Sequence, residues 1–209
     1  MTTKVVVRWH NQKGGCMQRI DVSEFKRPLG ELIDQCSGEN GRERFEEFKL
    51  WLKGVFPKLL AFIITVSVSA HKRFVMKDHL KSANIGWTGD NFKRVMLDKI
   101  EENVPAGEIN IHRLEKNSLN PEIMAEMGPE KRMTCLAHFL EMIGKQSKGQ
   151  EGPLLTDGSV NVAYIVGTDG NLWAVGARWR GFDRDWRVGA VPVEYPDGWV
   201  AGSRVLSSK

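Results

Sequence analysis

The sequence predicts an α+β protein, with a mixed helical body and a short N-terminal strand over residues 1–148 and a four-stranded antiparallel meander over residues 154–209. Before residue 148, apolar residues recur at helical spacing in several segments. After it, short β-branched and aromatic runs alternate with turns that contain Gly and Asp. The polar segment 147–153 contains two glycines and a proline and is the best candidate linker. A meander of about 60 residues has one good apolar face, so the two parts could share one core.

The first elements are a strand, a helix and a second strand. Residues 5–9 are rich in valine and predict a strand that ends in the polar turn 10–15. Asn40, with a glutamate three residues later, predicts the start of a helix that Pro57 ends. Residues 59–68 are apolar and β-branched toward their end, which favours a buried strand over the alternative of a core helix.

Helices are predicted to dominate the middle of the chain. Residues 74–103 predict a helical hairpin, because one apolar stripe precedes the turn 85–87 and a second stripe follows it. Residues 108–114 alternate weakly and predict a short strand. Residues 129–146 give the clearest helix, with a proline in the first turn and apolar residues on one stripe, namely Met133, Leu136, Leu140 and Ile143.

The last 50 residues predict four strands, over residues 160–166, 172–179, 186–193 and 199–206. Short turns with Asp-Gly and Pro-Asp-Gly sequences separate several of them. Short turns force neighbouring strands to be antiparallel, which predicts a meander.

Composition and charge exclude several classes of protein. Hydrophobic residues make up 41% and charged residues 27% of 209 residues, which is ordinary for a soluble globular protein. The longest uncharged apolar run, 59–70, is shorter than the about 20 residues that a membrane-spanning helix needs. Three scattered cysteines favour a reduced, cytoplasmic setting over secretion. The formal net charge of +4 comes mainly from residues 1–30 and 67–99, where a polyanion could be attracted.

The turn after the first predicted strand contains Lys13, Gly14 and Gly15. It resembles the opening of the deviant phosphate-binding loop of the ParA/MinD partition ATPases. In that pattern a second glycine, a second lysine and a Ser or Thr follow, but here Met17, Gln18 and Arg19 stand after the cysteine. The hydroxyl that would hold magnesium is absent, so the sequence argues against nucleotide hydrolysis and favours an ordinary glycine turn.

Metal and enzyme chemistry find little support in the sequence. Cys135 and His138 are three residues apart on a predicted helix and could supply two metal ligands, but no second pair with similar spacing occurs. A buried cysteine beside a helix histidine is the commoner situation. No nucleophile elbow and no His-Glu-x-x-His helix is present. We therefore predict no cofactor, no metal site and no catalytic residue, and a metal-dependent enzyme is the weakest alternative.

The predicted hairpin over 74–103 suggests a helix-turn-helix, in which a second helix enters the DNA major groove. Its outward side chains could contact bases and phosphates, and the following strand 108–114 could act as a wing. The predicted nucleic-acid-binding residues are Asn91, Lys93, Arg94, Lys99, His112 and Arg113. A plain helical hairpin with a solvated basic face is the structural alternative.

The tail holds four of the seven tryptophans. Strand alternation places Trp173, Val175, Ala177 and Trp179 on one face of a strand, with Arg178 and Arg180 on the opposite face. Burial of the tryptophan face against the helices is the commoner outcome. The alternative is an exposed recognition platform, because Trp and Arg are favoured interface anchors. The predicted partner-binding residues are Arg178, Trp179, Arg180 and Trp186.

Taken together, the sequence favours a non-enzymatic, cytoplasmic binding protein that contacts DNA or RNA through the segment 74–103 and does not enter a membrane. The alternative is a protein–protein adaptor or inhibitor that uses the Trp/Arg-rich C-terminal sheet.

Overall fold

The computed structural model describes residues 41–42, 45–46, 58–131 and 134–209. The chain divides into two units, residues 1–57 and 58–209, and the second unit carries all the elements discussed below. The strand predicted at 5–9, the glycine turn after it and most of the helix predicted before Pro57 lie outside the described residues. Of that helix, residues 41–42 and 45–46 are described, and they are helical.

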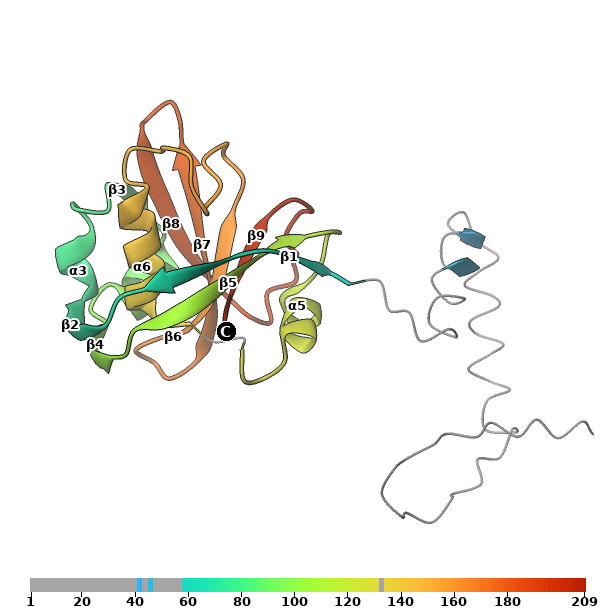
Figure 1. The fold of residues 1–209 in the computed structure, drawn as a ribbon, viewed down its shortest axis with the longest axis horizontal. Helices are drawn as coiled ribbons and strands as arrows, with labels where there is room; N and C mark the ends of the chain where they lie inside the picture. Colours follow the sequence, from blue (N-terminus) through green and yellow to red (C-terminus); the bar gives the residue numbers. More distant parts are fainter. Residues whose placement is uncertain (1–40, 43–44, 47–57, 132–133) are drawn as a thin grey trace, which may run out of the picture. The chain divides into compact units, whose positions relative to one another are not determined.

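In residues 58–209, strands and short helices follow one another without a regular repeat (Figure 1). In chain order the elements are β1 (Leu60–Val68), β2 (His71–Val75), α3 (Met76–His79), β3 (Ile85–Thr88), α4 (Asp90–Met96), β4 (Ile100–Val104), β5 (Gly107–Leu114), α5 (Asn120–Met127), α6 (Leu136–Lys145), β6 (Asn161–Val166), β7 (Leu172–Arg180), β8 (Asp185–Pro192) and β9 (Arg204–Ser208).

The predicted helical body followed by a four-stranded meander is wrong. Seven strands form one mixed sheet in the order β1-β5-β9-β6-β7-β8-β3, and β2 pairs with β4 in a separate two-stranded sheet. β3 is parallel to β8 and β6 is parallel to β9, whereas the other neighbours are antiparallel. Strands from both sides of the predicted linker 147–153 therefore belong to the same sheet.

The C-terminal meander is confirmed only for β6, β7 and β8, which are consecutive neighbours. The fourth predicted strand, β9, does not pair with β8. It returns across the sheet and inserts between β6 and β5. Residues 193–203 are long enough to make this return, so a tight turn does not determine the partner of β9.

The helical hairpin predicted over 74–103 is also wrong. α3 has four residues, and β3 follows it where a turn was expected. The sequence of β3 is Ile-Gly-Trp-Thr, in which three of four residues favour strands, and it extends the main sheet beside β8. The second predicted helix exists as α4, with Phe92, Val95 and Met96 buried. A strand of the main sheet thus separates α3 from α4, and two helices arranged in this way are not a helix-turn-helix.

α6 covers one face of the main sheet and buries its apolar stripe there. The helix predicted over 129–146 is confirmed in its second half, but it begins only at Leu136. The Glu101 carboxylate explains this start, because it accepts hydrogen bonds from the backbone N–H groups of Leu136 (3.1 Å) and Ala137 (2.8 Å). A carboxylate is favourable at this position because the helix N-terminus carries partial positive charge.

The opposite face of the sheet is only partly covered. α5 and the segment around Trp199 pack there over β5, β6 and β9 and enclose Tyr164, Ile123 and Leu114. Asn120 joins the two covering segments, because its Oδ1 accepts hydrogen bonds from Tyr164 Oη (3.0 Å) and Trp199 Nε1 (2.7 Å). Among the described elements, none packs over β7, β8 and β3 on this face, where a groove lies instead.

Glu141 anchors α6 to the turn between β1 and β2, and we expect this contact to make stability depend on pH. Burial alone would raise the pKa of Glu141, but hydrogen bonds from Lys145 and from the backbone and hydroxyl of Ser69 lower it to about 2. The folded state thus favours the carboxylate. Its contribution is complete above pH 4.5 and is lost as the pH falls toward 2. We expect Glu141→Gln to lower the free energy of unfolding by about 2 kcal/mol at pH 7 and by far less at pH 2.5.

Urea unfolding of both proteins at the two pH values measures this difference. An equal loss at pH 7 and pH 2.5 would show that packing, and not the ionised carboxylate, makes the contribution of Glu141.

Candidate functional site

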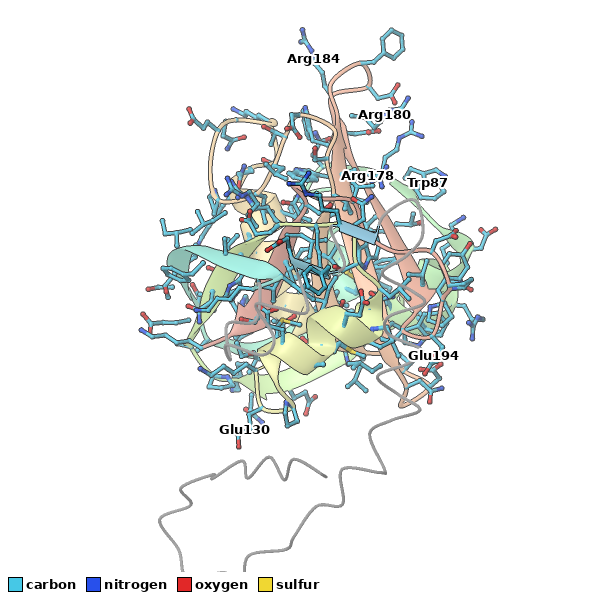
Figure 2. The ribbon with its side chains drawn as sticks, turned by 90° about the vertical axis from the view of Figure 1, so that its right-hand side faces the viewer. Trp87, Glu130, Arg178, Arg180, Arg184 and Glu194 are labelled. Carbon is cyan, nitrogen blue, oxygen red and sulfur yellow. The ribbon has the colours of Figure 1, made fainter. Side chains whose placement is uncertain are left out.

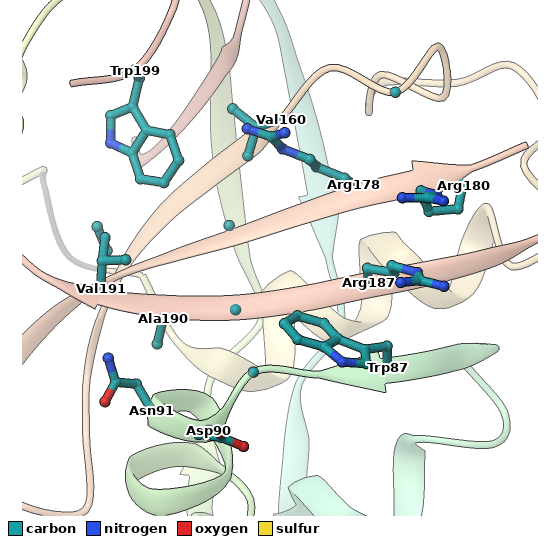
Figure 3. Close-up of a pocket in the computed structure, with 15 residues that line it drawn as sticks. Trp87, Asp90, Asn91, Val160, Arg178, Arg180, Arg187, Ala190, Val191 and Trp199 are labelled. Atoms are coloured by element: carbon teal, nitrogen blue, oxygen red, sulfur yellow. The ribbon is translucent and has the colours of Figure 1, made fainter. Parts of the chain in front are cut away.

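The open part of the sheet holds a groove of about 660 Å³, over β7, β8 and β3 and beside the start of α4 (Figure 3). Its floor is the face of β7 and β8 opposite α6. Side chains on this face follow the strand alternation, so successive residues of the floor are two positions apart and about 7 Å from each other. Its lining includes glycines in the floor, tryptophans at the sides and arginines at one end, together with small apolar residues and with Asp90 and Asn91 at the start of α4.

The floor of the groove contains a pair of glycines side by side. Gly176 of β7 is the register partner of Gly189 of β8. Ala174 and Val191 form the pair on one side of them, and Arg178 and Arg187 form the pair on the other side. The glycine pair exposes bare backbone in the middle of the sheet, between an apolar row and a charged row.

Two tryptophans flank the glycine pair. Trp87 of β3 is 50% exposed, and its ring lies over Gly89 so closely that a Cβ added to Gly89 would be 3.2 Å from Trp87 Cη2. On the other side, a Cβ added to Gly176 would be 3.4 Å from Trp199 Cη2. Figure 3 shows the two indoles on opposite sides of the β7–β8 floor.

The arginine end of the groove has an unbalanced charge. Arg187 donates a hydrogen bond to Asp183 (2.6 Å) and lies 3.7 Å from an oxygen of Asp185, and Arg180 lies 3.6 Å from Asp183. Arg178 has no ion-pair or hydrogen-bond partner within the described part of the chain, although it stands directly opposite Arg187. Asp183 and Asp185 therefore balance the charge of Arg187, whereas the charge of Arg178 is not balanced by any described carboxylate.

The hairpin beyond the groove adds to this basic and aromatic surface. Residues 178–187 contain four arginines and two aspartates, a net charge of +2. Figure 2 shows Arg178, Arg180 and Arg184 along this hairpin, with Trp87 beside it. Phe182 lies in the turn of the hairpin and is 94% exposed.

The structure separates the predicted partner-binding residues onto two faces. The alternation predicted for β7 is confirmed, because Trp179 is buried on the α6 side whereas Arg178 and Arg180 line the groove. Trp186 of β8 is 0% exposed and packs edge-on against Trp179, with ring centroids 5.7 Å apart. Only the arginines of the set therefore reach the surface that could meet a partner.

The predicted nucleic-acid-binding residues do not share one surface. Asn91 lines the groove, and Lys93 next to it forms an ion pair with Asp90 (3.3 Å). The guanidinium of Arg94 lies over the Trp173 ring, 5.1 Å from its centroid. Lys99 is mostly buried and lies 3.4 Å from Glu101.

The other two predicted residues lie on β5, at the opposite side of the sheet. Arg113 donates a hydrogen bond to Glu115 (2.9 Å). His112 is within hydrogen-bonding distance of Ser207 (3.0 Å), and burial lowers its pKa, which disfavours the charged form that a phosphate would attract.

Cys135 is the residue before the first turn of α6, and His138 lies in that turn. His138 Nε2 is 3.1 Å from the carbonyl oxygen of Pro105, and burial raises the pKa of the Cys135 thiol. Among the described residues, no three His, Cys, Asp or Glu side chains are grouped to hold a metal ion.

Sequence reasoning missed Trp87, Arg187 and Trp199 as parts of one site. Trp87 was placed in a turn, because a four-residue strand gives almost no periodic signal. The other two belong to predicted strands, but only the pairing of β3 with β8 brings Trp87 and Arg187 together as register partners. The sequence signal that could have indicated the site was Gly176 and Gly189 in neighbouring strands, since glycine inside a strand marks a place where a ligand or another backbone approaches closely.

Comparison of the chain with models of protein families, with curated proteins and with solved structures found no match. In the part of the chain that is described, no helix has the length and apolar character needed to span a membrane. The groove itself is therefore the basis for a functional proposal.

Proposed function

We propose that this protein binds single-stranded nucleic acid in the groove over β7, β8 and β3. The observation that carries the proposal is the row of Arg178 and Arg187 beside a bare glycine pair and two accessible indoles. Proteins that hold single strands combine positive charge for the backbone with aromatic rings on which bases stack. This groove offers both within one surface.

Charge complementarity favours a polyanion. Arg178 is exposed and unpaired among the described residues, and the hairpin 178–187 has a net charge of +2. A phosphate beside Arg178 would balance its charge and would form charge-assisted hydrogen bonds. Trp87 is the register partner of Arg187, and Phe182 lies between Arg180 and Arg184 in the sequence, so these exposed rings could stack on bases whatever their sequence.

A protein partner is the second candidate, because Trp and Arg also anchor protein interfaces. The centres of protein interfaces are depleted of charged residues. Here the two arginines form the register pair directly beside the glycine pair, so charged groups lie next to the centre of the groove. We therefore favour single-stranded nucleic acid as the ligand of the groove. If this protein bound a protein partner and had no affinity for nucleic acid, the proposal would be contradicted.

Fluorescence anisotropy with labelled single-stranded RNA and DNA of about 12 nucleotides, and with the matching duplex, tests the proposal. We expect the single strands to bind with Kd at or below about 100 μM at physiological salt, and more tightly than the duplex. Arg178→Glu should weaken binding by about tenfold or more and reduce the salt slope by about one. Trp87→Ala should weaken it by about tenfold through lost stacking.

Two variants away from the groove serve as matched controls. Arg73→Glu makes the same charge change at an exposed arginine of β2, and Phe62→Ala removes an exposed aromatic ring of β1. Both should bind within about twofold of the parent protein, because neither contacts the groove. The proposal is overturned if no single strand binds, or if the control variants lose as much affinity as the groove variants.

A further inference from the structure

We infer that the glycine-floored half of the groove is a slot for one nucleobase, and this inference rests on the proposed binding of single-stranded nucleic acid. We call this half the base slot. Its floor is Gly176 and Gly189, and its side walls are Trp87 and Trp199. The proposed function requires arginines for the phosphates and exposed rings for stacking, whereas this inference adds that one base occupies a defined place on the glycine floor.

Gly189 lies inside β8 and its φ is not in the left-handed region. A Cβ added to it would meet none of the described atoms within 4 Å, so contacts with the described residues do not require glycine here. Glycine inside a strand costs about 0.5–1 kcal/mol relative to alanine. A position that tolerates a side chain, yet lacks one at this cost, is typical of a place where another molecule approaches the backbone.

The two indoles stand on opposite sides of this bare floor (Figure 3). The Cη2 atom of Trp199 lies close to the floor at Gly176, whereas Trp87 lies close to Gly89, at the end of β3 beside the floor. Trp199 is held in place, because its Nε1 donates to Asn120 Oδ1 (2.7 Å) and Asn120 is fully buried. Trp199 is therefore a fixed wall, whereas the half-exposed Trp87 at the sheet edge can adjust to a ligand.

The chemistry of the slot fits a flat, aromatic group that is attached to an anion. The floor and walls are apolar and aromatic, which suits the faces of a base. Arg178 and Arg187 form the next row, about 7 Å along the strands, where they can reach the phosphate of a nucleotide whose base fills the slot. At the other end, Asn91 at the start of α4 supplies an amide that can bond the edge of a base.

Gly189→Val tests the slot directly. Valine favours strands and has room for its Cβ, so the variant should fold with an unchanged or raised melting temperature. Its branched side chain would fill the floor and exclude a base, but it would leave the arginine row unchanged. Anisotropy is measured with a single-stranded oligonucleotide of about 12 nucleotides and with an abasic strand of the same length, which keeps only sugars and phosphates.

We expect the parent protein to bind the base-bearing strand about tenfold more tightly than the abasic strand. Gly189→Val should bind both strands equally, at the affinity of the abasic strand. Arg178→Glu should lower the affinity for both strands by the same factor, so the variant should keep the preference for the base-bearing strand. Gly144→Ala, a control on α6 where an added Cβ also meets nothing within 4 Å, should bind like the parent protein.

The outcomes separate the two proposals. Equal binding of both strands by the parent protein would overturn the base slot and the stacking contribution in the proposed function, and would leave only the contact of the arginines with phosphates. A folded Gly189→Val that keeps the full preference would overturn the slot as well. Failure of the parent protein to bind either strand would overturn the proposed function and the slot with it.

Discussion

Trp186→Ala is expected to lower the free energy of unfolding by about 4 kcal/mol, in the range of the largest losses for a buried aromatic residue. Trp186 is 0% exposed, belongs to the core between α6 and the sheet, and packs edge-on against Trp179. Its Nε1 also donates a hydrogen bond to the carbonyl oxygen of Gln146 (3.0 Å), just beyond the end of α6. Alanine would leave a cavity and would remove one of the two hydrogen bonds that the Gln146 carbonyl oxygen accepts, the other coming from the backbone N–H of Gly149 (2.9 Å). Urea unfolding with tryptophan fluorescence or circular dichroism measures the change.

Trp186→Phe separates the contribution of ring packing from that of the hydrogen bond to Gln146. Phenylalanine keeps most of the ring volume but cannot donate to Gln146, so we expect a loss of about 1–2 kcal/mol. If Trp186 instead acted by contacting a partner, its alanine variant would fold normally and lose only binding. That result would contradict the assignment of Trp186 to the core.

Gly149→Ala is expected to cost about 3 kcal/mol. Gly149 has φ +69°, a conformation that is unfavourable for alanine by about 1 kcal/mol. In addition, a Cβ at this position would overlap the indole of the buried Trp179, so either the turn or the ring must move. Differential scanning calorimetry or urea unfolding measures the loss.

Gly170→Ala is the matched control for this substitution. Gly170 has a similar φ of +77°, but a Cβ there would meet nothing within 4 Å. We expect it to lose only the backbone contribution of about 1 kcal/mol. Equal losses for the two variants would show that contact with Trp179 adds nothing at Gly149.

The sequence predicted those parts of the fold that depend on neighbours along the chain. β1, β5 and the hairpin strands β6, β7 and β8 were predicted because their apolar patterns and turns are local signals. The place of β9 could not be predicted in this way, because its partners β5 and β6 are chosen by long-range pairing. The start of α6 was missed for a related reason, since its capping carboxylate, Glu101, is 35 residues away.

The site was predicted in part. Strand alternation correctly separated Arg178 from Trp179, but alternation cannot say which face a helix will cover. The helical pattern of Phe92, Val95 and Met96 was real, yet Ile85 to Thr88 became a strand because the free edge of β8 was available to it. Trp87 thereby joined the arginines from almost 100 residues away, which no local pattern contains.

The position of β9 has a consequence for how the protein is made. Within the sheet, the pair β1–β5 and the meander β6–β7–β8 are joined through this one strand, which follows all of them in the chain. On the ribosome, the sheet cannot be completed until residues 204–208 have emerged, so its completion follows translation of residue 208. Until that moment, the inner edges of β5 and β6 are open to pairing with other nascent chains.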